Sequence, residues 1–316
     1  MRRARVTKHE FVQSNECEDA VTDLDFAALT PGLVPEAERE QTPAPARPYL
    51  SAQIGCSEVA AMMVALRTWD GMPARVVGYL ERCAERAAWH GPVKSMPAHL
   101  KHPELSPAWI ADNAKPVRTS VGTLPKCIAI KAGVRAKDAR DDYMERGERL
   151  EPVLWRMWID SMRGDPRCTL DVESLRSQHD VLAMYPREWG VRAPSVRHPD
   201  EPRLVTYLDG WGADLLGEPV VVNCKLSRDR KPEPDAAAWI QMQGEIACTR
   251  ATLGLLVFGE RWNADYIDGP EWERGPIVPH PVKPDAGAER AILATVAAAW
   301  VEIDRVRVEM AKEKAA

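Results

Sequence analysis

The segment that most constrains the fold is a β-branched run with two polar residues at alternate positions, Val220-Val-Val-Asn-Cys-Lys-Leu226. Valine-rich runs of this kind are typical of strands that are buried on both faces. Because side chains alternate across a strand, Asn223 and Lys225 lie on the same face. A buried amide and a buried ammonium cost free energy unless other groups pair with them. The chain must therefore bring polar partners to this face from other segments.

The segments around this strand indicate an α/β fold. Upstream, Leu204-Val-Thr-Tyr-Leu-Asp-Gly210 has the pattern of a strand that ends in an acid and a turn, and residues 212–219 would join the two strands as a hairpin. Downstream, residues 235–251 have the pattern of a helix that begins at Asp235, and residues 253–258 that of a third strand. This order predicts a mixed central β-sheet flanked by helices.

Periodicity predicts helices in other parts of the chain as well. Ser57 would be the N-cap of one helix, and residues 74–90, 137–163 and 285–314 would form three more. Residues 178–194 instead have the pattern of a hairpin or of irregular strands.

These patterns divide the chain into three parts. Residues 1–47 are rich in proline and are expected to be largely irregular. Residues 48–284 would form the α/β domain, with a helical insertion at about 70–136, and residues 285–316 would form a C-terminal helix.

Composition limits the possible function classes. The net charge of −5 over 316 residues gives no global attraction to nucleic acid, so DNA binding would need a local basic patch. The chain has seven cysteines and no CxxC pair, which argues against a disulfide framework, a zinc ribbon and a clustered iron–sulfur site. We expect reduced thiols, no signal peptide, no membrane-spanning segment and a cytoplasmic location.

Two acids from other segments are candidate partners for the polar strand face. Asp209 ends the upstream strand, and Glu151 interrupts the apolar stripe of the helix over 137–163, directly before Pro152, where that helix would restart or kink. Oxygen ligands of this kind suit Mg²⁺, and Lys225 could then orient or deprotonate an attacking water. The alternative is that Asp209 caps a turn and Lys225 is an ordinary edge charge.

A third polar residue lies on a helix. Gln243 shares the apolar face of the helix over 235–251, where a buried amide needs a hydrogen-bond partner. It would either support the site or be a satisfied core glutamine.

Four motifs in order resemble those of the YqaJ-like viral recombinase family, the lambda-exonuclease type within the PD-(D/E)xK nuclease superfamily. Each motif alone is weak, whereas their common order over about residues 50–260 is specific. The motifs are Ile54-Gly-Cys-Ser-Glu-Val-Ala-Ala61, Arg146-Gly-Glu-Arg-Leu-Glu-Pro152, the block from His198-Pro through Leu208-Asp-Gly210 to Lys225, and Gln241-Met-Gln-Gly-Glu-Ile-Ala-Cys-Thr249.

The resemblance implies a restriction-endonuclease-like (PD-(D/E)xK) core and a metal-dependent exonuclease. Such an enzyme degrades linear double-stranded DNA from an end, 5′ to 3′, exposes single strand for a single-strand annealing protein, and forms a ring-shaped homo-oligomer.

The resemblance also implies residue roles. Glu151 and Asp209 would bind Mg²⁺ or Mn²⁺, Lys225 would be the catalytic lysine, and Gln243 would support the site near the attacking water. Ser57 would contact the terminal phosphate of the DNA, and Arg47 could serve in place of an arginine that the family has before the first motif. Independently of the resemblance, Arg146 could line the DNA path or be an ordinary solvated charge.

One position departs from the family pattern. Asn223 stands where the (D/E)xK motif has an acid, so it would be a weaker third metal ligand and a neutral member of the catalytic set. The chain could be a silent DNA-end-binding module, the asparagine could be an engineered change, or another acid could substitute. Glu245 is one candidate but should point away, since it lies about 200° around the helix from Gln243; Asp214 in the hairpin is another. A restriction- or repair-type endonuclease is a further alternative.

Overall fold

The computed structural model describes residues 53–101, 108–137, 142–184, 195–227, 234–260 and 277–315. The predicted Pro-rich segment 1–47, with Arg47, lies outside these ranges. None of the helices in the described ranges combines the length and apolar character that a membrane crossing requires.

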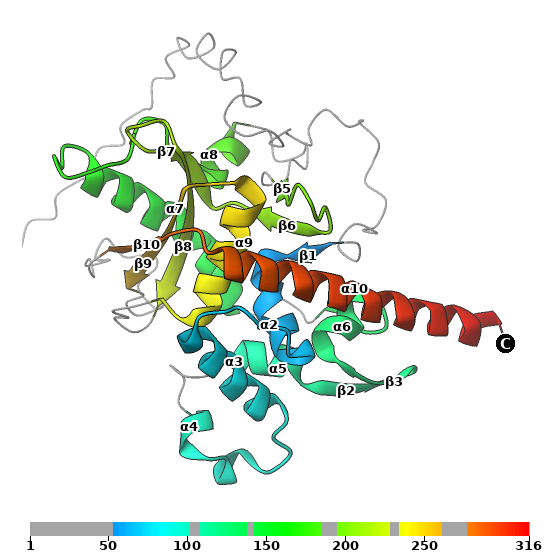
Figure 1. The fold of residues 1–316 in the computed structure, drawn as a ribbon. Coiled ribbons are helices and arrows are strands. Elements are labelled where there is room, and N and C mark those ends of the chain that lie inside the picture. Colours follow the sequence, from blue (N-terminus) through cyan, green and yellow to red (C-terminus); the bar gives the residue numbers. More distant parts are fainter. Residues whose placement is uncertain are drawn as a thin grey trace, which may run out of the picture.

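The centre of the fold is a five-stranded mixed sheet, which confirms the predicted fold class (Figure 1). Two long strands at its middle, β8 and β9, run parallel, and the other neighbouring pairs are antiparallel. The strands follow the order β10 (Val278–Val282), β9 (Leu253–Glu260), β8 (Pro219–Ser227), β7 (Gly210–Ala213) and β4 (Arg176–Ser177).

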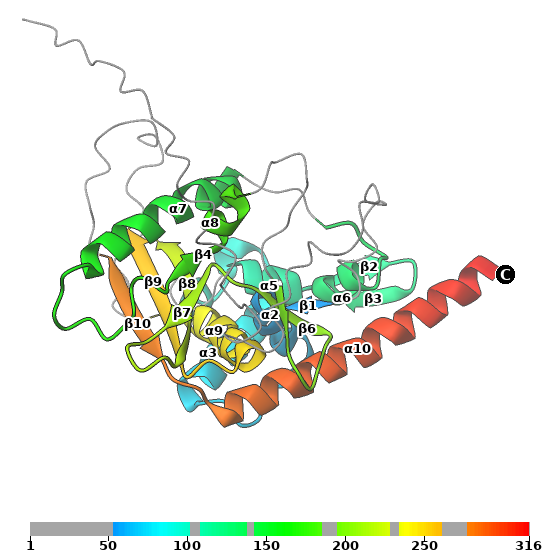
Figure 2. The ribbon, with the colours of Figure 1, turned by 90° about the horizontal axis from the view of Figure 1, so that it is seen from above.

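Helices cover both faces of this sheet (Figure 2). On one face, Val222 and Cys224 of β8 pack with Leu154 and Trp158 of helix α7 (Asp142–Met162). On the other face, Val221 belongs to a larger apolar cluster that includes helices α2 (Cys56–Leu66) and α9 (Ala236–Thr249). Strand alternation therefore directs Asn223 and Lys225 toward the same side as Val221.

Helix α9 is the crossover between the parallel strands β8 and β9, as such a pair requires. It begins where predicted, because the Asp235 side chain accepts a hydrogen bond from the Ala238 N–H at 2.8 Å. Every residue from Met242 to Thr249 is buried, since α9 lies between the sheet, α2 and helix α10 (Ala286–Ala315). Polar side chains on any side of α9 between Met242 and Thr249 are consequently buried.

A smaller sheet adjoins the central one, and the predicted strand 204–210 divides between the two. In the small sheet, β6 (Leu204–Tyr207) pairs in parallel with β1 (Ile54–Gly55) and antiparallel with β5 (Ser195–Arg197). The chain then crosses at residues 208–209 and enters β7. The predicted strand is confirmed over residues 204–207, but its predicted hairpin with the 220–226 strand is wrong, because β7 pairs with β8 instead. Asp209 therefore lies at the crossing between two sheets.

The predicted hairpin or irregular strand at 178–194 is also wrong over its first part. Helix α8 (Gln178–Ala183) forms there because Ser177 and Asp180 make a capping box, in which each side chain accepts the other's backbone N–H at 3.1 Å. Residues 185–194 lie outside the described ranges.

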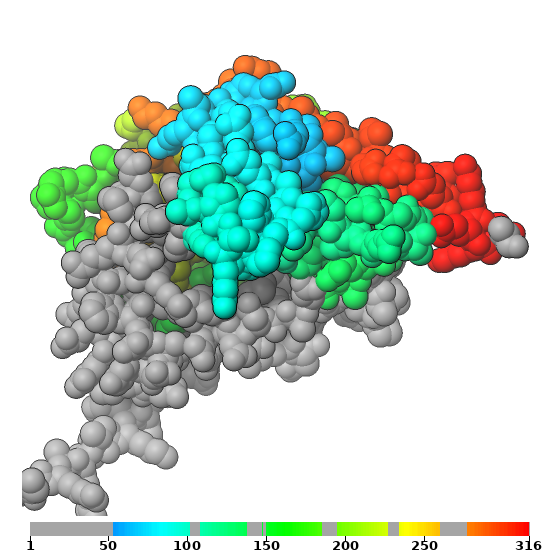
Figure 3. Space-filling view, turned by 90° about the horizontal axis from the view of Figure 1, so that it is seen from below, coloured from blue at the N-terminus to red at the C-terminus, as the bar shows by residue number. Residues whose placement is uncertain are grey.

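The segment between α2 and α7 packs into the same apolar cluster as α2 and α10. Figure 3 shows this region, coloured cyan to green, covering one face of the molecule beside the C-terminal end of α10. Its elements are α3 (Ala74–Ala87), the 3₁₀ turn η3 (Val93–Ser95), α4 (Ala98–Lys101), α5 (Ala108–Ala114), β2 (Pro116–Thr119), β3 (Gly122–Pro125) and α6 (Lys126–Lys131).

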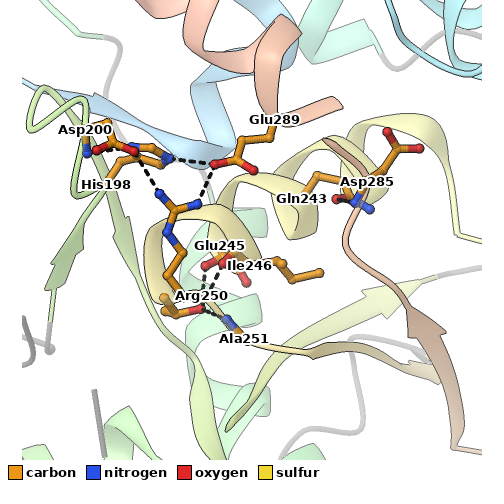
Figure 4. A network of polar contacts seen from close by, with 10 residues as sticks. His198, Asp200, Gln243, Glu245, Ile246, Arg250, Ala251, Asp285 and Glu289 are labelled. Carbon is orange, nitrogen blue, oxygen red and sulfur yellow. Dashed lines mark hydrogen bonds and ion pairs between the residues drawn. The ribbon is translucent and has the colours of Figure 1, made fainter. Parts of the chain in front are cut away.

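Ion pairs fix the C-terminal end of α9 to the start of α10 (Figure 4). Arg250, which ends α9 in the left-handed conformation, donates to Glu289 at 2.7 Å and to Asp200 at 2.9 Å. The buried ring of His198 contacts the same Glu289 oxygen at 3.2 Å and accepts the Asp200 N–H at 3.1 Å. This network fixes how α9 lies across the sheet.

Gly210 is predicted to be required for the position of the sheet crossing. A Cβ at this residue would meet the Trp155 ring of α7 and the Arg176 carbonyl oxygen at 3.1 Å. Gly210→Ala should therefore lower the free energy of unfolding by roughly 1–3 kcal/mol in urea denaturation. Gly147→Ala, within α7 and with open space around the new methyl group, is the matched control and should raise it by about 0.5–1 kcal/mol. Equal effects at the two sites would contradict this packing.

Candidate active site

Asp209 is held beside β8 by hydrogen bonds from two elements. Its Oδ2 accepts the backbone N–H of Cys224 at 3.0 Å, and its Oδ1 accepts from the Gln178 side chain at 3.3 Å. Burial raises the pKa of Asp209 from 3.8 to about 6; the positive charge of Lys225 opposes the rise and the negative charge of Glu151 adds to it. The three predicted residues 151, 209 and 225 thus lie near enough for their charges to interact.

Glu151 reaches this region from α7, which is one continuous helix with Pro152 inside it. Of the two predicted alternatives, a restart or a kink at Glu151, the restart is therefore wrong. The Glu151 side chain is partly exposed and lies 3.6 Å from Nε2 of His179 on α8. His179 was not predicted as a site residue, because residues 178–194 were expected to form a hairpin or irregular strands.

Lys225 and Asn223 both face α9, as the alternation along their strand predicts. Lys225 Nζ donates to the side-chain oxygen of Gln241 at 3.1 Å, and the Asn223 amide donates to Oε1 of Glu245 at 2.9 Å. The Gln241 amide also donates to this Glu245 oxygen, at 2.8 Å. The hydrogen-bond partners of the polar strand face are therefore Gln241 and Glu245, whereas Asp209 and Glu151 were the expected partners.

Gln243 does not reach the site, so its predicted place near an attacking water is wrong. Its amide nitrogen donates to the Lys283 carbonyl at 2.8 Å, and its oxygen accepts the Asp285 N–H at 3.0 Å, directly before α10 (Figure 4). It is the satisfied core glutamine that was the alternative. The error arose because α9 is buried on all sides, so its apolar stripe does not identify the side that faces β8.

Glu245 is fully buried on the side of α9 that faces β8, so the expectation that it points away is wrong. Burial, together with the negative charge of Asp209, raises the pKa of Glu245 from 4.5 to about 8, against the opposing effect of Lys225. A signal was present in the sequence, since Gln241 and Glu245 are polar residues four apart and so share one face of the helix.

The remaining candidates have mixed outcomes. Gly55, not Ser57, is the N-cap of α2, and Ser57 is an exposed residue in its first turn. Asp214 stays in the β7–β8 turn, where its Oδ1 accepts the N–H groups of Leu216 and Glu218 at 2.8 and 3.0 Å, so it cannot substitute for Asn223. Arg47 and the side chain of Arg146 lie outside what the structure describes.

The oxygen atoms here fit a hard divalent cation. Within the described part of the chain, Asn223 Oδ1 and Glu245 Oε2 are both buried and have no hydrogen-bond partner. Over the same residues, no three His, Cys, Asp or Glu side chains already converge on one point that could hold a metal ion. The predicted ligands are two carboxylates and one amide, a set of oxygens that Mg²⁺ or Mn²⁺ would complete with water.

A scan against protein-family models found no match, and a search of curated proteins found no significant one. Among solved structures, the chain is similar to LHK-Exo, an alkaline exonuclease from Laribacter hongkongensis, with 14% identity over 83% of this chain and 95% of that one and a TM-score of 0.44. The complex of LHK-Exo with dAMP gives 13% identity, 84% and 94% coverage and a TM-score of 0.47. A phage-related exonuclease from Haemophilus somnus is 15% identical over 82% of this chain and 96% of that one, with a TM-score of 0.46.

The raised pKa of Glu245 predicts a pH dependence of stability in the presence of a chelator. Between about pH 5 and 8 the unfolded chain has released a proton that folded Glu245 retains, so the free energy of unfolding should fall as pH rises. Above the folded pKa both states are ionised and this contribution becomes constant. Glu245→Gln removes it, so urea denaturation in EDTA should show a shallower decline for the variant. Parallel pH profiles for the two proteins would contradict the assignment.

Proposed function

We propose that this chain is a divalent-cation-dependent deoxyribonuclease that degrades linear double-stranded DNA from an end. The observation that carries the proposal is that Asp209, at the sheet crossing, accepts the backbone N–H of Cys224 on β8 at 3.0 Å and is acted on by the charges of Glu151 on α7 and Lys225 on β8. Two acids and a lysine beside a buried amide are the groups that cation-assisted phosphodiester hydrolysis uses.

The residues divide into ligands and a water-orienting group. Glu151, Asp209 and Asn223 would hold Mg²⁺ or Mn²⁺, which supplies positive charge to the phosphate as negative charge develops on it. The ammonium of Lys225 has three N–H donors, of which one is directed at Gln241, so two remain for an attacking water and a phosphate oxygen. Lys225 would therefore orient the water for attack on phosphorus.

Recognition of the DNA end is the finer part of the proposal. Ser57, exposed in the first turn of the 11-residue helix α2, would contact a terminal 5′ phosphate, because free N–H groups at a helix N-terminus favour anions. Arg47 and Arg146 would lie along the DNA path, and digestion would run 5′ to 3′. A ring-shaped homo-oligomer and a single-strand annealing partner belong to the same proposal, whose support is the four sequence motifs.

Nucleotide release from a 5′-phosphorylated linear duplex tests the function. We expect release with Mg²⁺ or Mn²⁺, none with EDTA, and a loss of roughly 100-fold or more for Lys225→Ala and for Asp209→Asn. Lys115→Ala, which removes an exposed lysine, is the matched control and should keep full activity. Unchanged release by Lys225→Ala would contradict the role of this lysine.

Closed circular duplex distinguishes end-dependent digestion from other modes. The proposal expects circular DNA to survive under conditions that degrade the linear form. Internal cuts would indicate an endonuclease, and salt-dependent DNA binding without cleavage would indicate an end-binding module.

A further inference from the structure

The site proposed above lacks the acid of the (D/E)xK motif, because the neutral Asn223 stands at that position. Asn223 is only 1% exposed, and its amide nitrogen donates to Oε1 of Glu245 at 2.9 Å. Its own oxygen, Oδ1, has no hydrogen-bond partner among the described residues. An asparagine used only to tie β8 to α9 would leave this buried oxygen unsatisfied at a cost in free energy.

Glu245 has the matching feature. It is 0% exposed, and Oε1 accepts from two amides, those of Asn223 and Gln241. Its second oxygen, Oε2, is buried and likewise has no partner within the described part of the chain. Two such oxygens on a pair of side chains in contact are the kind of atoms that bind hard cations.

A cation bound here would take the place of the proton that buried Glu245 holds below about pH 8 in its absence. The ionisable groups that interact electrostatically with Glu245 are Lys225 on β8, the carboxylate of Asp209 and the thiol of Cys56 on α2. Gln241 connects Glu245 to Lys225, because it accepts from the lysine and donates to the acid. A partly buried chain of hydrogen bonds thus runs from the proposed water-orienting lysine to the acid on α9.

We propose that Glu245 supplies the negative charge that Asn223 lacks, so that the Asn223–Glu245 pair together replaces the motif acid as a ligand for the divalent cation. The proposal rests on the nuclease function proposed above. In it, Gln241 is a positioning residue that holds Glu245 and Lys225 relative to each other. The asparagine is then a necessary partner, since an acid at 223 would face the buried Glu245 carboxylate at hydrogen-bond distance and repel it.

Manganese binding tests this without measuring activity. Free Mn²⁺ is quantified by electron paramagnetic resonance in titrations of the full chain, and thermal melts in EDTA check that each variant folds. Glu245→Gln should weaken Mn²⁺ binding by roughly tenfold or more. The double variant Asn223→Asp with Glu245→Gln exchanges acid and amide, keeps the net charge and should bind within about threefold of the original protein. Glu218→Gln, an exposed acid in the β7–β8 turn, is the matched control and should change nothing.

The outcomes separate this inference from the function on which it rests. If Glu245→Gln binds Mn²⁺ as well as the original protein while Asp209→Asn loses binding, the role of Glu245 is overturned and the nuclease proposal stands. If neither the original protein nor any variant binds Mn²⁺, both are overturned. If Glu245→Gln does not fold, the double variant decides, since restored binding supports the exchange and lost binding overturns it.

Discussion

The structure depends on one interaction, the pairing of a polar strand face with a polar helix face inside the core. Lys225 and Asn223 on β8 donate to Gln241 and Glu245 on α9 at 3.1 and 2.9 Å, and a third hydrogen bond of 2.8 Å joins Gln241 to Glu245. Each of these groups would be costly to bury alone, and together they specify how the crossover helix lies on the sheet. The same pairing keeps ionisable groups and oxygen atoms in the interior, which is where cation-assisted chemistry needs them.

The position of the acids follows from the change of sheet. Because the chain leaves the small sheet at Tyr207 and enters the central sheet at Gly210, the intervening Asp209 belongs to neither strand, and its side chain accepts the Cys224 N–H. The close contact of Gly210 with Trp155 brings α7 against this crossing, and α7 carries Glu151. The packing of α7 on one face of the sheet thus places Glu151 near Asn223 and Lys225, which point to the other face.

Much of this arrangement follows from local sequence rules, and the errors have a common cause. The Val-rich strand, its alternation, the Asp235 cap and the long C-terminal helix were predicted because neighbouring residues determine them. The sheet crossing at Asp209 and the orientation of α9 were not, since both depend on contacts between distant segments. In particular, the family resemblance placed Gln243 in the site, and its position on an apolar helix face could not correct this, because α2 and α10 bury the other faces of α9 as well.

The central claim is that a divalent cation binds where α7, the sheet crossing, β8 and α9 meet. An anomalous difference map from a crystal soaked in Mn²⁺ tests it most directly. The account predicts the strongest peak at about 2.1 Å from a carboxylate oxygen of Asp209, with Glu151 and the Asn223–Glu245 pair around it. Peaks confined to surface acids, with Asp209 still bound only to the Cys224 N–H and to Gln178, would contradict it.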